Sequence, residues 1–287
     1  MSFEHFIYKG VIFPTNAYTE ECIHFAENEF QVLDDDIYNV TYPKSGTHWM
    51  AEILNLIKYN GDPTICKTVP VFSRSPWYET AEGQTNMKDV TSPRIISSHL
   101  PFHIFAKSYF KSNAKIVYTM RNPKDVLVSL FHFAKILCFY KDPENFQEMI
   151  EAFLQGKTLY GSWFDHIKGW MQMKDDPKFF LITYEELQQD LRGSVVRICK
   201  FLGKELDDAA IDSVVEHSSF RTMKDNKMCN FTLVPQDFCD QTKGSFMRKG
   251  ISGDWKNHFT VAQNEYFDRI FQEKMKDLNI NFFWKES

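Results

Sequence analysis

The segment of residues 42–49, YPKSGTHW, places the strongest constraint on what this chain can fold into. Pro43 cannot donate a hydrogen bond to a strand ladder, so we expect the β-like run of residues 37–42 to end there. The next residues predict a helix over 47–59, because apolar residues recur on one helical face at Trp49, Met50, Ile53, Leu54 and Ile57. The segment therefore predicts a strand, a tight loop and a helix N-terminus in immediate succession.

The predicted loop has the chemistry of an anion site. Unpaired backbone N–H groups and the positive end of the helix dipole face such a loop, and this one carries Lys44, Ser45 and Thr47. The Walker A loop of nucleotide triphosphatases reads G-x-x-x-x-G-K-[ST], whereas here Lys44 precedes Gly46 and the upstream loop glycine is missing. We therefore predict a phosphate-binding loop of a different kind.

The composition is that of a globular protein with a buried core, because 43% of the 287 residues are hydrophobic and 25% are charged. A net charge of −5 argues against nucleic acid as a partner. The 16% of aromatic residues fits a thick core or an apolar ligand cavity, the core being the simpler interpretation.

The cysteines and the N-terminal residues favour a cytoplasmic protein. The cysteines are scattered without a C-x-x-C pair, which is typical of reduced thiols: Cys22, Cys66, Cys138, Cys199, Cys229 and Cys239. The first residues lack the basic and apolar regions of a secretory signal, and no run approaches the ~18 apolar residues of a spanning helix. We therefore expect no membrane association.

Short apolar strands alternate with helical patterns along the chain. We expect strands at residues 37–42, 94–98, 115–120 and 179–184, and helices at residues 47–59, 124–139, 146–155 and 187–202. This alternation predicts an α/β fold: one domain over residues 1–287, with a central, mainly parallel sheet flanked by helices and a P-loop-like phosphate loop. Ligands bind beyond the carboxyl ends of such strands, where this chain has Lys44, His99, Arg121 and Tyr184.

Arg121 stands where the third predicted strand meets a helix. Pro123 suits the first turn of that helix, and Asp125 complements its positive end. With Ser129 two turns further on, an arginine fork and a hydroxyl would suit a second phosphate. Taken alone, pairing of Arg121 with a surface carboxylate would be the simpler interpretation.

Two histidines are candidates for proton transfer. A lone histidine after a strand is more often structural, but His99 stands at a strand end in a chain with an anion loop, and histidine is the usual base for a hydroxyl nucleophile. His48 lies in the phosphate loop itself, where a proton shuttle and a plain hydrogen-bonding group are both plausible.

A basic run near the C-terminus, Arg248-Lys249-Gly250, could close over an anion, although such runs are common on surfaces. Taken together, the segments resemble the cytosolic sulfotransferases, which move a sulfuryl group from 3′-phosphoadenosine 5′-phosphosulfate (PAPS). The resemblance covers essentially the whole chain: residues 42–47 resemble the 5′-phosphosulfate loop, residues 121–129 the 3′-phosphate segment and residues 248–256 the C-terminal cofactor motif. The strings RSPW (74–77), SSHLP (97–101), YGSWF (160–164) and DWKNHF (254–259) are most similar to the hydroxysteroid and bile-acid branch.

The resemblance implies sulfuryl transfer from PAPS to an alcohol of a hydroxysteroid, bile acid or similar bulky apolar acceptor, with PAP as the second product and no metal. Lys44 would stabilise the departing phosphate, and His99 would take the proton of the acceptor. The implied cofactor-binding residues are Lys44, Ser45, Gly46, Thr47, His48, Trp49, Arg121, Ser129, Tyr184, Ser218, Met223, Arg248, Lys249 and Gly250. The implied acceptor-binding residues are Pro14, Tyr18, Phe72, Trp77, Phe133, Phe139 and Phe231, whose alternative role is core packing.

Two positions depart from the family pattern. Relatives usually carry asparagine where this chain has His48, so two histidines compete for the role of base. Ala134 stands where a tryptophan is common in steroid-sulfating relatives. We expect a wider pocket there, which would favour a bile acid or another bulky alcohol.

The motif K-x-x-x-T-V-x-x-x-E of these enzymes matches Lys256, Thr260, Val261 and Glu265, and it implies a weak homodimer. An exposed helix end is the alternative interpretation. Residues 230–246 suit a loop of the kind that gates a site.

Other functions remain to be weighed against sulfuryl transfer. A nucleotide-phosphate kinase would need a triphosphate loop and a carboxylate for Mg²⁺, and neither is visible. A non-catalytic lipid carrier would leave Lys44, His99, Arg121 and Ser129 unexplained. A degenerate sulfotransferase that binds PAPS but turns over poorly is the third alternative.

Overall fold

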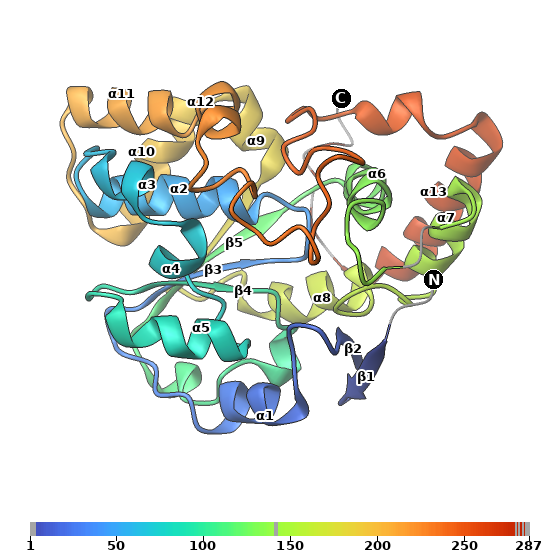
Figure 1. Cartoon of the computed structure of the whole chain (residues 1–287), viewed down its shortest axis with the longest axis horizontal. Helices are drawn as coiled ribbons and strands as arrows, with labels where there is room; N and C mark the ends of the chain where they lie inside the picture. The colour runs from blue at the N-terminus through green and yellow to red at the C-terminus, as the bar shows by residue number, and fades with distance from the viewer. Residues whose placement is uncertain (1–3, 141–142, 279, 281, 283, 285–287) are drawn as a thin grey trace.

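A four-stranded parallel sheet forms the centre of the molecule (Figure 1). In the computed structural model, which describes residues 4–140, 143–278, 280, 282 and 284, the order of this sheet is β4-β3-β5-β6. Its strands are β3 (Ile37–Thr41), β4 (Ile95–Ser98), β5 (Lys115–Met120) and β6 (Phe179–Thr183). All neighbouring strands run parallel, so their carboxyl ends meet at one edge.

Side chains of the strands alternate between two apolar cores. In β5, Ile116, Tyr118 and Met120 belong to one core and Val117 belongs to the other. Successive side chains of a strand point to opposite faces, so both faces of the sheet are covered. This explains why the strand reads as a continuous apolar run, as parallel strands do.

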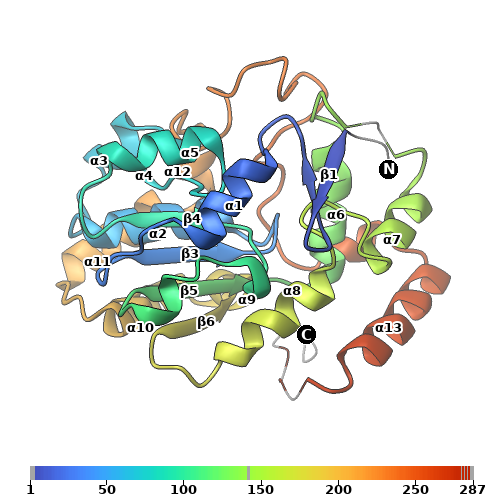
Figure 2. The same cartoon turned by 90° about the horizontal axis from the view of Figure 1, so that it is seen from below.

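One face of the sheet is covered by α2 (Thr47–Lys58), α10 (Leu191–Leu202) and α11 (Asp208–His217) (Figures 1 and 2). Their apolar stripes pack onto the sheet, with Met50 and Ile53 of α2 fully buried. The helix that follows the predicted phosphate loop is therefore fixed rigidly to β3.

The opposite face packs against α1 (Glu20–Asn28) and α8 (Trp163–Trp170) (Figure 2). The same core extends to one side through α6 (Pro123–Ala134), α7 (Phe146–Leu154) and α13 (Val261–Met275). A two-stranded antiparallel sheet, β1 (His5–Tyr8) and β2 (Val11–Pro14), adjoins this core.

Shorter helical segments connect these elements. The short α-helices are α3 (Thr64–Thr68), α4 (Val71–Arg74), α5 (Ala81–Asn86), α9 (Tyr184–Gln189) and α12 (Phe220–Asp225). The 3₁₀ turns are η1 (Met87–Asp89), η2 (Phe102–Ile104), η3 (Tyr109–Lys111), η4 (Met171–Met173) and η5 (Asp254–Asn257).

The predicted α/β fold and its four strands are confirmed, whereas two predicted helices differ. The helix expected over 187–202 is two helices, because Asp190 ends α9 and its carboxylate caps α10 by accepting from the N–H of Gly193 at 2.8 Å. The helix expected to reach residue 139 ends at Ala134. The following residues pair with residues 238–240 instead, through the N–H of Cys138 and the carbonyl of Ile136.

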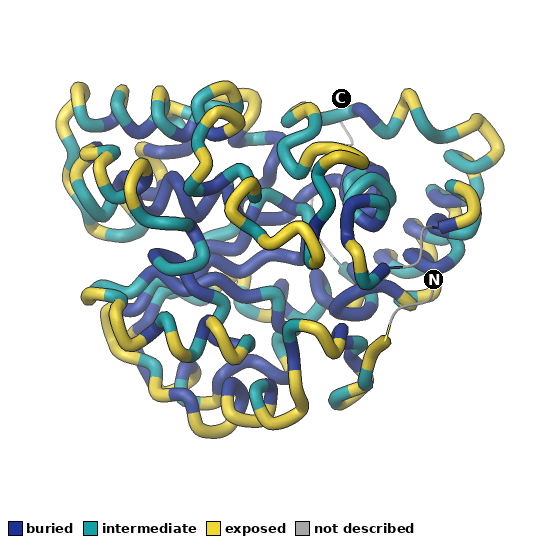
Figure 3. Tube along the Cα trace, in the orientation of Figure 1, coloured by how far each residue is buried: buried dark blue, intermediate teal, exposed yellow. Residues whose placement is uncertain are grey.

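Residues 230–246 form an irregular segment, which we call the lid, in front of the sheet edge (Figure 1). Figure 3 shows it as mostly intermediate or exposed, in contrast to the buried strands and α2. The isolated bridge between Leu137 and Cys239 fastens the lid to the end of α6.

The order of the strands places a natural ligand site between β3 and β5. The chain moves from β3 to β4 on one side and from β5 to β6 on the other, so the connections diverge at this point. In open parallel sheets such a switch point leaves a crevice beyond the carboxyl ends of the strands. The residues that follow β3 and β5 are the predicted phosphate loop and Arg121.

All six cysteines are free thiols, as the sequence predicted. In the part of the chain that the structure describes, no helix combines the length and the apolar character needed to cross a membrane.

The buried ion pair between Glu52 of α2 and Arg74 of α4 generates a stability prediction. Both side chains are at most 5% exposed, and Oε2 of Glu52 and Nη1 of Arg74 have no further partner. Arg74→Met should lower the free energy of unfolding by about 3–5 kcal/mol, because it leaves a buried charge unpaired. Urea denaturation measures the loss.

The matched control is the double variant Glu52→Leu with Arg74→Met, which removes both charges. We expect it to recover most of the stability, because an apolar pair of similar volume needs no partner. A double variant as unstable as Arg74→Met would contradict this account of the pair.

Candidate active site

A cavity of about 1320 Å³ opens at the carboxyl ends of the strands. The residues that follow all four strands line it: Lys44, His99, Arg121 and Tyr184. Sites for a single small molecule are typically about 300–1000 Å³. This cavity therefore has room for two ligands side by side.

The phosphate loop makes a sharp turn between β3 and α2. Lys44 and Gly46 have φ angles of +68° and +110°, in the region that glycine adopts most easily. A Cβ on Gly46 would lie 3.0 Å from the ring of Tyr184, so the glycine also allows this close approach. Gly46 occupies the N-cap of α2 without a side-chain cap, which leaves the first turn available to an anion.

The hydroxyl groups of this loop differ in their surroundings. The hydroxyl of Thr47 contacts that of Thr41 at 2.6 Å, and its carbonyl accepts from Asn39 at 2.9 Å, so Thr47 is tied to β3. Ser45 is fully buried, and its hydroxyl has no protein partner. An unpartnered buried hydroxyl in such a loop fits a site completed by a ligand oxygen.

Arg121 joins the loop to a distant segment of the chain. Its guanidinium donates to the carbonyl of Lys44 at 2.9 Å and to the carbonyl of Ile251 at 3.1 Å. It also lies 4.1 Å from the centre of the Tyr184 ring. The buried Nε of Arg121 has no partner, so one donor remains for a ligand.

The basic residues of the C-terminal run converge on Asp254. Arg248 Nη2 lies 2.7 Å from Asp254 Oδ2, and Lys249 Nζ donates to Oδ1 at 2.6 Å. Burial of Asp254 opposes ionisation, but the hydrogen bonds from Lys249, Asn257 and Arg248 outweigh it and hold its pKa well below the ordinary value. Both cations are therefore placed beside the cavity by a single buried carboxylate.

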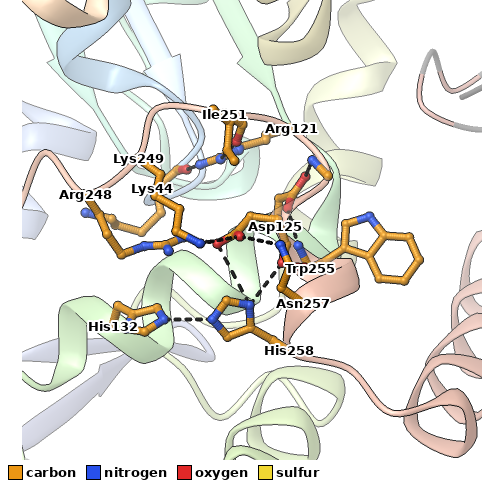
Figure 4. A network of polar contacts seen from close by, with 12 residues as sticks. Lys44, Arg121, Asp125, His132, Arg248, Lys249, Ile251, Trp255, Asn257 and His258 are labelled. Atoms are coloured by element: carbon orange, nitrogen blue, oxygen red, sulfur yellow. Dashed lines mark hydrogen bonds and ion pairs between the residues drawn. The ribbon is translucent and has the colours of Figure 1, made fainter.

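Asp125, in the first turn of α6, holds the loop that carries Asp254. Its carboxylate accepts from the backbone N–H of Gly253 at 2.7 Å and of Trp255 at 2.9 Å. This contact docks the C-terminal run against the helix that follows Arg121 (Figure 4).

A histidine pair extends the same network. His258 Nδ1 donates to the carbonyl of Asp254 at 3.0 Å, and the Nε2 atoms of His258 and His132 lie 3.0 Å apart (Figure 4). Burial, together with Arg248, lowers the pKa of His132 to about 4. His132 is therefore neutral at physiological pH.

The ammonium group of Lys44 lies between two aromatic rings. It is 3.8 Å from the centre of the Phe133 ring and 4.1 Å from that of Phe246 in the lid. Burial and, to a smaller extent, the nearby charge of Arg121 lower its pKa to about 7. Lys44 can therefore exchange a proton near neutral pH.

His99 has a defined tautomer. Its Nδ1 lies 2.8 Å from the carbonyl of Thr41, which can only accept, so Nδ1 carries the proton and Nε2 is free to act as a base. Burial lowers the pKa of His99 to about 4, although the hydrogen bond to Thr41 opposes this. The imidazole is therefore neutral at physiological pH.

His48 lies among aromatic rings. Its ring centre is 4.8 Å from that of Phe246, 5.4 Å from Phe231 and 5.6 Å from both Phe72 and Trp77. The buried Nδ1 has no partner, and burial holds the pKa of His48 well below its usual value. In contrast to His99, no hydrogen bond within the described part of the chain fixes its tautomer.

Most of the predicted site residues line the cavity. These are Pro14, Tyr18, Lys44, Gly46, Thr47, His48, Trp49, Phe72, Trp77, His99, Arg121, Ser129, Phe133, Phe139, Tyr184, Met223, Phe231, Arg248, Lys249 and Gly250. Ser45 and Ser218 are fully buried and do not line it. Ser218 instead donates to the carbonyl of Val214 at 2.7 Å, as serines in helices often do.

Ala134 does not line the cavity but adjoins a separate void of about 10 Å³. Ser129 and Phe133 of the same helix line the cavity, and one residue step turns about 100° around α6. A wider acceptor pocket at this position stays a prediction.

Phe220 and Phe246 are among the residues of the cavity wall that were not predicted from the sequence. Phe220 lies against Gly250, where a Cβ would come within 2.0 Å of its ring. Phe246 stacks on Phe231 with ring centres 4.0 Å apart. An aromatic residue just before the basic run of residues 248–249 was a signal for Phe246, whereas Phe220 had no local signal.

The comparisons with known proteins agree on one protein family. A family model described as a sulfotransferase domain matches residues 34–279. The human protein Sulfotransferase 2B1 is 53% identical over 283 residues, which cover 99% of this chain and 77% of the relative. The 3-beta-hydroxysteroid sulfotransferase of Cavia porcellus is 47% identical over 281 residues, which cover 97% of each chain. A crystal structure of mouse sulfotransferase SULT7A1 complexed with PAP matches with a TM-score of 0.80 and 32% identity, covering 96% of this chain and 95% of that one.

The environment of Lys44 predicts its reactivity. Acylation by an amine-reactive reagent, followed by peptide mass spectrometry as a function of pH, should show a midpoint near pH 7 for Lys44, because burial favours the neutral amine. Phe246→Ala should move this midpoint upward by admitting water. A Lys44 midpoint equal to that of the exposed Lys67 would contradict the assignment.

Proposed function

Because the chain belongs to the sulfotransferase family, we propose that it transfers a sulfuryl group from PAPS to a hydroxyl of a hydroxysteroid, bile acid or similar bulky apolar alcohol. One observation carries the proposal. The cations Lys44 and Arg121 and the neutral base His99 line a single cavity that is large enough for a cofactor and an acceptor.

The cofactor half of the cavity would be the part between the phosphate loop and the C-terminal run. PAPS supplies the sulfuryl group and carries anions at two ends, which suits two separated cationic sites. The first turn of α2 with Lys44 and Ser45 would hold the 5′ end, and Arg121, Ser129, Arg248 and Lys249 the 3′-phosphate. The unpartnered Nε of Arg121 and hydroxyl of Ser45 support this fit.

The adenine would lie against an aromatic surface of the same half. Trp49 and Tyr184 have ring centres 5.0 Å apart, and Met223 lines the cavity beside Phe220. We keep Ser218 in the proposed cofactor-binding set because of its place in the chain near this aromatic surface. Its hydroxyl already donates to the carbonyl of Val214.

Lys44 would stabilise the charge that develops on the departing phosphate. An ammonium in a buried site acts more strongly than one in water, because fewer water molecules screen it. The depressed pKa of Lys44 in the free protein would rise when an anion binds beside it.

His99 is the proposed base. Its Nε2 is the unprotonated nitrogen, and the hydrogen bond of Nδ1 to Thr41 orients the ring. His48 lacks such an orienting contact, so we assign it to packing beside the cofactor loop and not to proton transfer.

The acceptor half of the cavity would be its apolar part. Phe72, Trp77, Phe133, Phe139 and Phe231 line it together with Pro14 and Tyr18. A relative named as a 3-beta-hydroxysteroid sulfotransferase is 47% identical over 97% of this chain, which favours a steroid alcohol. Steroids require a largely apolar wall with few polar anchors.

We also propose a domain organisation, an oligomeric state and a cellular compartment. We propose a single domain over residues 1–287 and a weak homodimer through Lys256, Thr260, Val261 and Glu265. Val261, at the start of α13, is 75% exposed and supports such a contact. Six free thiols suit the reducing cytoplasm, where we place the protein.

The assignment of His99 as the base predicts the effects of two histidine substitutions. His99→Ala should lower kcat on a steroid or bile acid about 10²–10⁴-fold, because the acceptor hydroxyl loses its base, and PAP affinity should stay unchanged. His48→Ala is the matched control and should keep most of the turnover. PAPS-dependent sulfation of a 3-hydroxysteroid, a bile acid and a simple phenol measures both.

Other outcomes would revise this proposal in different ways. Collapse of turnover only in His48→Ala would move the base into the phosphate loop. PAP binding without turnover on any acceptor would contradict the assignment as an active sulfotransferase.

The docking of the C-terminal run generates a second prediction. Asp125→Ala should weaken PAP binding about ten-fold, or roughly 1.4 kcal/mol, because the loop that carries Arg248 and Lys249 loses its anchor. Titration calorimetry measures the change. Asp208→Ala, in the first turn of α11, is the control and should leave affinity unchanged. Equal affinity in both variants would disprove the role of Asp125.

A further inference from the structure

A buried carboxyl group, Glu79, contacts the main chain of His99 without lining the cavity. It shortly precedes α5 in the chain, and its Oε1 accepts from the backbone N–H of His99, the residue that follows β4, at 2.8 Å. Glu79 is 0% exposed, and its Oε2 has no hydrogen-bond partner among the residues that the structure describes. Burial of a carboxyl group costs free energy, so the presence of Glu79 at this buried position requires an explanation.

Among the described residues, Glu79, His166 and Thr41 form hydrogen bonds with His99. The carbonyl of His99 accepts from Nε2 of His166 at 3.1 Å, and Nδ1 donates to the carbonyl of Thr41. His166 is itself oriented by the hydroxyl of Tyr118, 2.8 Å from its Nδ1. Every polar atom of His99 except Nε2 therefore has a protein partner.

The surroundings of Glu79 are uncharged. The titratable groups that face it are the hydroxyls of Tyr18, Tyr38, Tyr78 and Tyr160, whose pKa values burial raises, and the imidazole of His99, whose pKa burial lowers. Within the described part of the chain, no ion pair joins Glu79 to a lysine or an arginine. A carboxylate here would be a buried charge without compensation.

We propose that Glu79 is a positioning residue for His99 and that it acts as an uncharged carboxylic acid. The proposal rests on the role of His99 as the base. By holding the N–H of His99, Glu79 fixes the main chain from which the ring reaches Thr41, and so fixes the direction of Nε2. A displacement of about 1 Å at a reacting group can cost about 10²-fold in rate.

The protonation state of Glu79 has a consequence for stability. Burial raises its pKa to about 8, although the hydrogen bond from His99 opposes this, whereas a free glutamic acid has a pKa of 4.5. Between these two values the unfolded chain releases the proton and the folded chain keeps it. Stability from this group is therefore complete below pH 4.5 and is lost as pH rises through about 8.

Two substitutions separate the hydrogen bond from the charge. Glu79→Gln keeps an oxygen acceptor for His99 and is neutral at every pH, so its kcat at pH 7 should stay within about two-fold of the wild type. Glu79→Ala removes the acceptor, so its kcat should fall at least about ten-fold, while KM for PAPS stays unchanged. Glu79→Met, which has similar volume and no oxygen, replaces the alanine variant if that protein fails to fold.

The pH profile distinguishes positioning from a merely structural role. In wild type and Glu79→Gln, kcat/KM should be flat down to about pH 5, because the pKa of His99 is about 4. In Glu79→Ala the loosened imidazole gains water and its pKa rises toward 6.5, so an acidic limb should appear within the measured range. Loss of thermal stability without any change in kcat or in this limb would overturn the proposal.

The charge state is tested separately by thermal unfolding. The Tm of Glu79→Gln minus that of the wild type should grow from pH 5 to pH 8. The reason is that only the wild type has a buried carboxyl group that favours unfolding more strongly as pH rises. A difference that shrinks over this range, or a glutamine variant as inactive as the alanine variant, would overturn the uncharged state.

His99→Ala, assayed in parallel, separates failure of this inference from failure of the proposed function. Retained turnover in His99→Ala would refute the proposed base itself. Lost turnover in His99→Ala, with normal kcat and pH profile in Glu79→Ala, would refute only the role of Glu79.

Discussion

The guanidinium of Arg121 donates to the carbonyls of Lys44 and Ile251, and these two hydrogen bonds hold three distant segments at one edge of the sheet. The phosphate loop, the end of β5 and the C-terminal run are separated by more than 70 residues each, as the sequence separations of 77 and 130 show. The side chain is buried and stacks on Tyr184. Its loss would therefore separate both cationic parts of the cavity at once.

Burial lowers the pKa values of the two titratable groups at the centre of the site. It lowers the pKa of Lys44 to about 7 and that of His99 to about 4. Desolvation disfavours the charged form of any basic group, so the same apolar wall keeps His99 neutral and able to accept a proton. An anion bound beside Lys44 would favour its charged form, and their attraction would be stronger than in water. In the proposed function, the aromatic residues would therefore act through the dielectric as well as through shape.

Local sequence patterns predicted the strands, the phosphate loop and the residues at the strand ends, because these depend on short-range spacing and on the geometry of a parallel sheet. They did not predict Phe220, Phe246 or Glu79, whose positions depend on contacts between distant segments. The helix break at Asp190 was also missed, since an aspartate suits both a helix surface and an N-cap. The family motifs did not show that Ser218 and Ala134 lie outside the cavity wall, because motifs locate a residue along the chain and not the direction of its side chain.

The aromatic pair of the lid has a thermodynamic consequence. Phe246 stacks on Phe231 and contacts both the ring of His48 and the ammonium of Lys44. In the proposed function, this ring would border both halves of the cavity. A ligand that shifts this ring in one half changes the binding free energy in the other, and the coupling must be equal in both directions. Affinity for either ligand is therefore a property of the pair of ligands and not of each half alone.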